Sequence, residues 1–362
     1  MDLLTSVTQL FRRDAAHLEQ VVLAPDHISP PAPDTAPLKA NAGYFRLWVV
    51  EMFLKSDRDW FKTLYPVVQS LTSFHFGTSN MQIAQVAGPG RLQNVDPSHL
   101  DRVIQQNLAL TPLIPFTGGT VEVEVGLIAM QASDLLQRFL TVMSSFSQLL
   151  AVPQLSAALT IANTVSSGVE QLLGVSGNSM VLGYHDTFQG ADGSGSAPLA
   201  ACNIVVLSAP SGTYPPEKLW VKDSHLLYGD SMDSAQPLTG VAYMLLRVET
   251  SQHRDDWDSL PNIKEYWDKA IEALGQLDAS GNPRVADADI FIRNAVVQAL
   301  QSPDLTQADQ MQSARALRDK YQQYKEAIGA KEIVPVPTLA DVAKAARGLS
   351  PEPVTLGELF PQ

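Results

Sequence analysis

Two histidines that each lie close to an aspartate are the residues of this sequence best suited to chemistry. His185 directly precedes Asp186, and His225 lies two positions after Asp223. A carboxylate that orients an imidazole makes it a general base, which can activate a serine hydroxyl for hydrolysis. Such neighbours are more often structural or surface residues, so we expect no catalytic role and keep both pairs as candidates for a hydrolase site. The serines considered as nucleophiles are Ser179, Ser194 and Ser224.

A second group with chemical potential is the acidic run Asp255, Asp256 and Asp258. Carboxylate oxygens are the ligands that calcium and magnesium ions prefer. The run also precedes a segment with helical periodicity, and acidic side chains stabilise the positive end of a helix dipole without any metal. We therefore expect no metal site, and these three residues are the candidates to be tested.

The local motifs of the common enzyme and cofactor classes are missing from the sequence. There is no Gly-Lys dipeptide, which excludes a P-loop, and neither a GxSxG nor an HExxH pattern occurs. The single cysteine, Cys202, excludes an intrachain disulfide and a zinc site built from several cysteines. Because it opens an apolar run, Cys202 is expected to be a small core residue. We therefore expect no cofactor and a non-enzymatic protein, with a hydrolase as an alternative.

Charge and composition restrict the partners. The chain of 362 residues carries 25 Lys and Arg against 38 Asp and Glu, a net charge of −13, and it has no basic run. Such a chain is poorly suited to bind nucleic acid or to dock on a membrane through a polybasic patch. A hydrophobic fraction of 45% is that of a folded globular protein, and the length suggests two or three domains.

The elements that must position these residues include a β-rich body over residues 43–253. Residues 121–125 alternate valine with glutamate, which is typical of a strand with one buried and one solvated face in an antiparallel sheet. Short apolar runs separated by glycine, proline and aspartate turns predict a sandwich-like arrangement of sheets. Further strands are expected at residues 44–54, 67–76, 81–87, 103–110, 179–184, 203–207, 219–221 and 241–248.

A helical hairpin is expected to interrupt this body at residues 134–174. Residues 139–169 contain no charged side chain, and apolar residues recur at helical spacing on both sides of Pro153. Three interpretations remain open: the hairpin packs on the sheet, associates with a second copy, or inserts residues 135–173 into a membrane as pore-forming proteins do. Each arm barely reaches the length that spans a bilayer and is rich in polar residues, so insertion is not favoured. The interaction candidates here are Phe139, Phe146 and Leu159.

The remaining segments flank the body. Residues 1–24 show helical periodicity and are expected to form an amphipathic helix, followed by a proline-rich linker over residues 25–42. Residues 254–330 predict three helices, the last capped by Ser302, and residues 331–362 form a proline-rich tail. An alternating three- and four-residue spacing in the third helix fits either packing within the chain or helix-mediated dimerisation. The residues assigned to that interaction are Leu317, Tyr321 and Tyr324.

Together these patterns predict an α+β fold, in which an antiparallel, β-sandwich-like body is interrupted by a helical hairpin and followed by a C-terminal helical region. The leading functional hypothesis is a non-enzymatic protein-interaction or scaffold module that associates with itself, as a homo-oligomer, or with another protein. The alternatives are a membrane-active effector that inserts residues 135–173, and a hydrolase with a tertiary His/Asp site. The first residues lack the basic flank and unbroken apolar core of a secretory signal, so we expect the protein in the cytoplasm.

Overall fold

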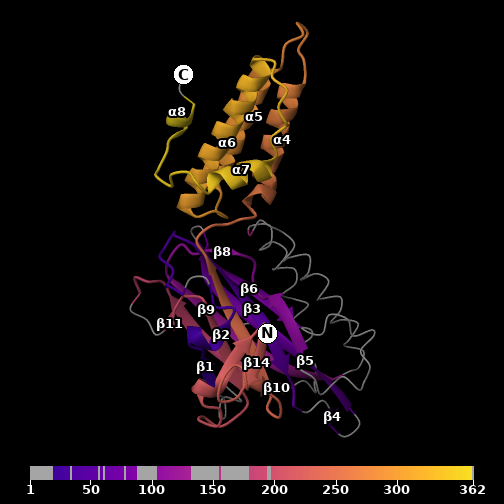
Figure 1. Ribbon diagram of the computed structural model, residues 1–362, viewed down its shortest axis with the longest axis vertical. Helices are drawn as coiled ribbons and strands as arrows, with labels where there is room; N and C mark the ends of the chain where they lie inside the picture. Colours follow the sequence, from indigo (N-terminus) through magenta and orange to yellow (C-terminus); the bar gives the residue numbers. More distant parts are fainter. Residues whose placement is uncertain are drawn as a thin grey trace. The chain divides into compact units, whose positions relative to one another are not determined.

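The computed structural model divides the chain into two compact units (Figure 1). The first, here called the β unit, consists of Met1–Ala40, Phe45–Ile114 and Gly118–Ser251. The second, the helical unit, consists of Asn41–Tyr44, Pro115–Thr117 and Gln252–Gln362. The structure describes residues 19–32, 35–55, 58–59, 62–76, 79–87, 104–131, 155, 179–193 and 197–360.

The first of three sheets in the β unit has the strand order β1-β12-β16-β3-β7, with β8 paired to β3. Strand β12 pairs antiparallel with β1 on one side and with β16 on the other, and β3 pairs antiparallel with β7. The strands are β1 (Glu19–Val22), β3 (Tyr44–Phe53), β7 (Ile104–Ala109), β8 (Ile114–Pro115), β12 (Cys202–Leu207) and β16 (Tyr243–Ser251).

The second sheet has the order β11-β10-β9-β5-β4, and β6 also pairs with β5. Its long central strands β10, β9 and β5 are antiparallel neighbours, whereas β11 runs parallel to β10. The strands are β4 (Arg58–Asp59), β5 (Lys62–Phe76), β6 (Ser79–Ala87), β9 (Thr120–Gln131), β10 (Ser179–Gln189) and β11 (Ala197–Pro198).

The third sheet is small, with the order β15-β14-β13-β2, and it packs on the first sheet. Val50, Val205 and Leu245 of the first sheet share one hydrophobic core with Val221 and Leu226 of the third. This two-layer packing of sheets is the expected sandwich-like arrangement. The elements are β2 (Ile28–Ser29), β13 (Leu219–Lys222), β14 (His225–Tyr228) and β15 (Gln236–Pro237), with short 3-10 helices η2 (Pro25–His27) and η5 (Pro216–Lys218).

The alternating pattern that predicts a half-buried strand is confirmed in β9. Val121, Val123 and Val125 are buried, whereas Glu122 between them is exposed. Because the side chains of a strand alternate between its two faces, the valines enter the core and the glutamates share the other face.

The N-terminal segments differ from their prediction. Residues 19–22 form β1 instead of the end of a helix over residues 1–24, because their burial alternates and their backbone pairs with β12. Residues 1–18 of that expected helix lie outside the described residues. The proline-rich residues 25–42 are more than a linker, since β2 joins the third sheet and Leu38 is buried.

The helical unit is built around α4, α5 and α6, which lie side by side (Figure 1). Their buried faces meet at Trp267 of α4, Ile292 and Val296 of α5, and Leu317 and Tyr321 of α6. The expected three helices are therefore confirmed. The elements are η6 (Trp257–Ser259), α4 (Pro261–Gly275), α5 (Val285–Gln301), α6 (Gln307–Gly329), α7 (Leu339–Ala346) and α8 (Leu356–Leu359).

Two features of the helical unit differ from the sequence-based expectation. Helix α6 is capped by Thr306 and not by Ser302, because the Thr306 hydroxyl accepts a hydrogen bond from the Asp309 backbone N–H. The proline-rich residues 331–362 are also not a separate tail. Helix α7 packs on α6, and Val342 and Leu359 are buried in the same core.

The expected helical hairpin at residues 134–174 lies outside the described residues, except for Leu155, which is buried. The interaction candidates Phe139, Phe146 and Leu159 therefore also lie outside them. Within the part of the chain that the structure describes, no helix combines the length and the apolar character that a membrane crossing requires.

Candidate functional site

A cavity of about 380 Å³ lies in the β unit, where one end of the first sheet faces the third sheet. Strands β3, β12 and β16 supply its sheet wall, and Ile28–Ala32 and the β13–β14 hairpin supply the rest of its lining. The residues that line it are Ile28, Ser29, Pro30, Pro31, Ala32, Trp48, Val50, Ala201, Cys202, Asn203, Val221, Ser224, Arg247, Val248, Glu249 and Thr250.

The guanidinium of Arg247 is the main charged group of this cavity. It lies over the Trp48 ring, with 5.0 Å between the guanidinium carbon and the ring centroid. Burial lowers the pKa of Arg247, an effect that the charge of Glu249 partly opposes. Among the described residues, no carboxylate lies within 4.0 Å of this guanidinium, and no hydrogen bond to it is found. Within the part of the chain that the structure describes, Arg247 is therefore a half-buried cation without a polar partner.

A second arginine reinforces this positive charge. Arg46, two residues before Trp48 on β3, lies 5.4 Å from the same ring centroid. Its Nε atom is buried without a hydrogen-bond partner. Arg46 does not line the cavity. Two guanidinium groups thus share one indole ring, and neither pairs with a carboxylate among the described residues.

The orientation of Trp48 is fixed by Glu249. The indole N–H donates a hydrogen bond of 2.5 Å to a carboxylate oxygen of Glu249. Asn203 of β12 is the register partner of Arg247 on β16, so its side chain lies on the same face of the sheet. The cavity therefore presents a cation, an amide and a fixed aromatic ring on one wall.

Ser224 contributes a hydroxyl from the opposite sheet. It lies in the two-residue turn between β13 and β14, where Asp223 and Ser224 have φ angles of 51° and 68°. Residues other than glycine and asparagine rarely adopt this left-handed conformation. The Asp223 backbone N–H donates a 2.9 Å hydrogen bond to the Ser29 carbonyl oxygen, which ties the turn to Ile28–Ala32.

Cys202 also lines the cavity, as a free thiol. Burial raises the pKa of Cys202 to about 11. Because the thiolate is the nucleophile, such a thiol is almost entirely protonated and unreactive at neutral pH. Cys202 is therefore a wall residue, close to the small core residue that the sequence predicts.

His225 does not pair with Asp223, the partner assigned from the sequence. Its Nδ1 lies 3.2 Å from a carboxylate oxygen of Glu51. The Glu51 residue is buried, with 1% of its surface exposed. The Leu226 backbone N–H donates 2.6 Å to the other Glu51 oxygen. Burial raises the pKa of Glu51, and the hydrogen bonds from Leu226 and His225 oppose this shift. Neither His225 nor Glu51 lines the cavity.

His185 likewise does not pair with Asp186, its neighbour in sequence. Adjacent residues of a strand point to opposite faces, and His185 Nε2 lies 3.1 Å from a carboxylate oxygen of Glu122 on β9. The Asp186 carboxylate accepts hydrogen bonds from the Tyr184 hydroxyl and from the Thr187 backbone N–H. Both His/Asp pairs proposed from sequence are therefore corrected to His/Glu pairs.

The acidic run at the start of the helical region does not converge on one point. Asp255 pairs with Arg347 at 2.8 Å and Asp256 pairs with Arg254 at 2.7 Å. Asp258 lies in the first turn of η6. In the described ranges, no group of three potential metal ligands includes any of them.

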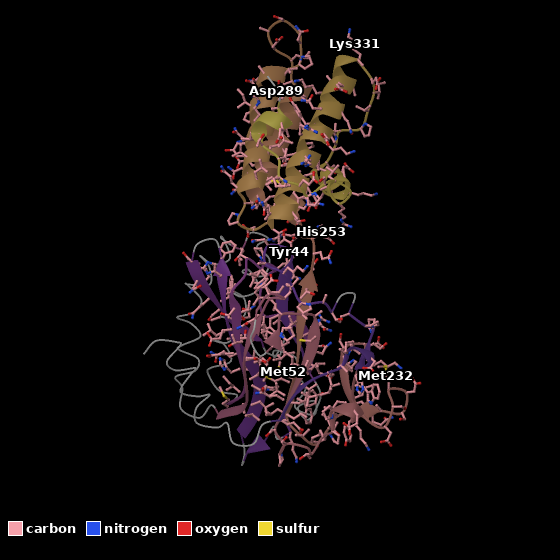
Figure 2. The ribbon with its side chains drawn as sticks, turned by 90° about the vertical axis from the view of Figure 1, so that its left-hand side faces the viewer. Tyr44, Met52, Met232, His253, Asp289 and Lys331 are labelled. Carbon is pink, nitrogen blue, oxygen red and sulfur yellow. The ribbon has the colours of Figure 1, made fainter. Side chains whose placement is uncertain are left out.

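A buried polar cluster in the helical unit has no counterpart among the sequence-based predictions. The Tyr44 hydroxyl donates 2.6 Å to the Asp309 carboxylate, which also lies 2.9 Å from His253 Nδ1. Tyr44 and His253 can be found in Figure 2. The Arg254 backbone N–H donates to the same carboxylate at 2.9 Å. No local signal predicts this cluster, because Tyr44 and Asp309 are 265 residues apart.

The three residues assigned to helix-mediated association, Leu317, Tyr321 and Tyr324, differ in how deeply they are buried. Leu317 and Tyr321 are fully buried in the core of the helical unit, so packing within the chain accounts for them. Tyr324 is partly buried and lines a second cavity of about 460 Å³ beside Val334–Pro337. The described lining of this second cavity contains no half-buried arginine without a polar partner, which the cavity between the first and third sheets has in Arg247. The cavity between the sheets is therefore the stronger candidate.

Comparison with known proteins gives no assignment for either cavity. No protein-family model, curated protein or solved structure matches this chain. The function therefore has to be inferred from the residues that line the cavity and from their surroundings.

Proposed function

We propose that the β unit is a binding module for a small organic carboxylate, which the cavity between the first and third sheets holds through Arg247. The observation that supports this most directly is the half-buried guanidinium of Arg247, which lines the cavity and has no carboxylate partner among the residues that the structure describes. A charged group removed from water is costly unless another charge or hydrogen-bonding group compensates it. A ligand carboxylate would provide that compensation, in the two-pronged geometry that guanidinium groups favour.

The shape of the cavity suits a compact ligand. Its volume of about 380 Å³ lies at the lower end of the range of small-molecule sites, about 300–1,000 Å³. The Trp48 ring and the prolines at positions 30 and 31 offer apolar surface for the body of the ligand. Asn203 and Ser224 offer hydrogen bonds to its polar groups.

The chemistry of the lining favours binding over catalysis. None of the described residues that line the cavity is a histidine, and the raised pKa of Cys202, about 11, leaves its thiol protonated at neutral pH. The one carboxylate of the lining, Glu249, is engaged with the Trp48 indole. We therefore propose that the ligand leaves the site unchanged.

A fragment screen tests the proposal. A set of small aliphatic and aromatic carboxylates, with the matching neutral amides, is titrated by calorimetry against the full chain. We expect carboxylates to bind and their amides to bind at least about tenfold more weakly, because a hydrogen bond to a charged group contributes about 1.5–3 kcal/mol.

The matched variants are Arg247→Gln and Arg46→Gln. Both arginines lie on the Trp48 ring, but only Arg247 lines the cavity. We expect Arg247→Gln to lose about tenfold or more in affinity, and Arg46→Gln to change it by less than about threefold. The proposal is wrong if no carboxylate binds at millimolar concentration, or if Arg247→Gln binds as the unmodified chain does.

The sequence-based proposal of a protein partner or of self-association now depends on residues 134–174, which lie outside the described residues. Light scattering of the full chain and of a Phe146→Glu variant tests it, since a charged side chain in an apolar contact would dissociate the assembly. The cytoplasm remains the proposed compartment.

A further inference from the structure

Three metal-ligating side chains come together on one face of the second sheet, away from the cavity between the first and third sheets. They are Glu122 and Glu124 of β9 and His185 of β10, and one potential ligand atom from each lies within 4.8 Å of the other two. We propose that they form a binding site for a first-row divalent metal ion, with Zn²⁺ as the reference case.

Strand pairing explains why these three residues meet. His185 is the register partner of Glu124, and Glu122 lies two residues further along β9 on the same face. The imidazole reaches diagonally to Glu122, where Nε2 and a carboxylate oxygen are 3.1 Å apart. Two ligands of a tetrahedral zinc ion, each about 2.0–2.1 Å from the metal, lie at a similar separation.

The two supporting strands are paired with each other at the site. Strand β9 pairs with β10 along one edge and with β5 along the other, so it is an interior strand of its sheet. Side chains on paired strands are held more precisely than side chains on loops. The three ligands are therefore close to the arrangement that a bound ion would need.

Among the described residues, the charges of the cluster are not balanced. No Lys or Arg pairs with either carboxylate among the described residues, and His185 is the only basic partner found. One oxygen of Glu124, Oε2, is buried without a hydrogen-bond partner. A divalent cation would neutralise both carboxylates and give the buried oxygen a ligand bond.

The donor set favours a particular class of ion. Imidazole nitrogen with two carboxylates suits zinc, iron, cobalt or manganese, whereas magnesium and calcium take oxygen ligands almost alone. Three protein ligands leave at least one coordination position open for water or another small molecule. His185 and Glu122 are each half exposed, so the site is accessible from solvent.

Calorimetric titration of chelator-treated full chain with ZnCl₂, and separately with MgCl₂, tests the proposal. We expect one zinc ion per chain, with magnesium binding at least tenfold more weakly. The ligand variants His185→Ala and Glu124→Gln should each weaken zinc binding at least tenfold. Substitution with Co²⁺, followed by visible absorption, reports whether a nitrogen ligand is lost in His185→Ala.

The control variants are Asp186→Asn and His75→Ala. Asp186 is the strand neighbour of His185 on the opposite face, and His75 is an exposed histidine of β5 in the same sheet. Both controls should bind zinc as the unmodified chain does, and circular dichroism confirms that each variant is folded. The proposal is overturned if zinc does not bind below 1 mM, if binding survives in His185→Ala and Glu124→Gln, or if His75→Ala abolishes it.

Discussion

Replacement of Tyr44 by phenylalanine should destabilise the helical unit through one hydroxyl group. Tyr44 is fully buried, and its hydroxyl donates 2.6 Å to the Asp309 carboxylate and accepts 2.8 Å from the Thr306 backbone N–H. Thr306 is the N-cap of α6 and Asp309 lies in its first turn. The Tyr44→Phe change therefore leaves a buried N–H and a buried carboxylate each with one partner fewer.

The size of the loss follows from the two contacts. A hydrogen bond to a charged group contributes about 1.5–3 kcal/mol, and a buried donor left unsatisfied costs about 1–3 kcal/mol. Asp309 keeps its hydrogen bonds with His253 and with the Arg254 backbone, which limits the first term. We therefore expect the free energy of unfolding of the helical unit to fall by about 2–4 kcal/mol.

Urea denaturation followed by circular dichroism at the helix band measures this loss, because the five helices α4 to α8 all lie in the helical unit. Tyr324→Phe is the matched control. Tyr324 lies on α6, the helix that carries Asp309, and is partly buried. Its hydroxyl has no hydrogen bond among the described residues. We expect Tyr324→Phe to change stability by less than about 0.5 kcal/mol. A Tyr44→Phe loss as small as that of the control would refute the reasoning.

Three further predictions concern other buried residues. Burial raises the pKa of Glu51 above 4.5, so the protonated carboxyl group favours the folded state, and this stabilisation is lost as pH rises through the folded-state pKa. The Glu51→Gln variant should therefore gain stability relative to the unmodified chain between pH 4 and pH 7, measured by urea titrations. Equal pH profiles of the two proteins would contradict this. Leu317→Ala should cost about 2–5 kcal/mol in denaturation and leave the elution volume in size exclusion unchanged, because Leu317 is fully buried within the unit. Alkylation of Cys202 should keep accelerating up to about pH 11, its raised pKa, and a plateau near pH 9 would show an unperturbed thiol.

The sequence predicts the regular elements well where their pattern is local. The alternation around Glu122 identifies β9, and the helical periodicity of residues 254–330 predicts the three helices that form there, α4, α5 and α6. Both signals act within a few residues, through the two-residue side-chain period of a strand and the 3.6-residue period of a helix. Such signals need no knowledge of the rest of the chain.

Where partners come from distant segments, the same approach fails. Residues 19–22 contain valines at spacings that also fit a helix, and only pairing with β12 makes them a strand. His225 lies two residues from Asp223, yet its carboxylate partner is Glu51, 174 positions away. Glu122 and Glu124 are recognised as a solvated strand face, but the ligand set becomes visible only once β10 brings His185 alongside.

In a chain with a net charge of −13, the lack of a carboxylate partner for Arg247 among the described residues is unexpected. The chain has 38 acidic and 25 basic residues, so carboxylates are in excess. A shortage of acidic residues therefore does not explain why Arg247 has no carboxylate partner among the described residues. Position explains it instead: among the described residues, the one carboxylate that lines the cavity is that of Glu249, which accepts a hydrogen bond from the Trp48 indole N–H and lies outside ion-pair distance of Arg247. A carboxylate of the protein paired with Arg247 would have compensated the charge of the guanidinium, but it would also have filled the open space beside it. The fold keeps both the charge and the space, which is the arrangement that an anionic ligand requires.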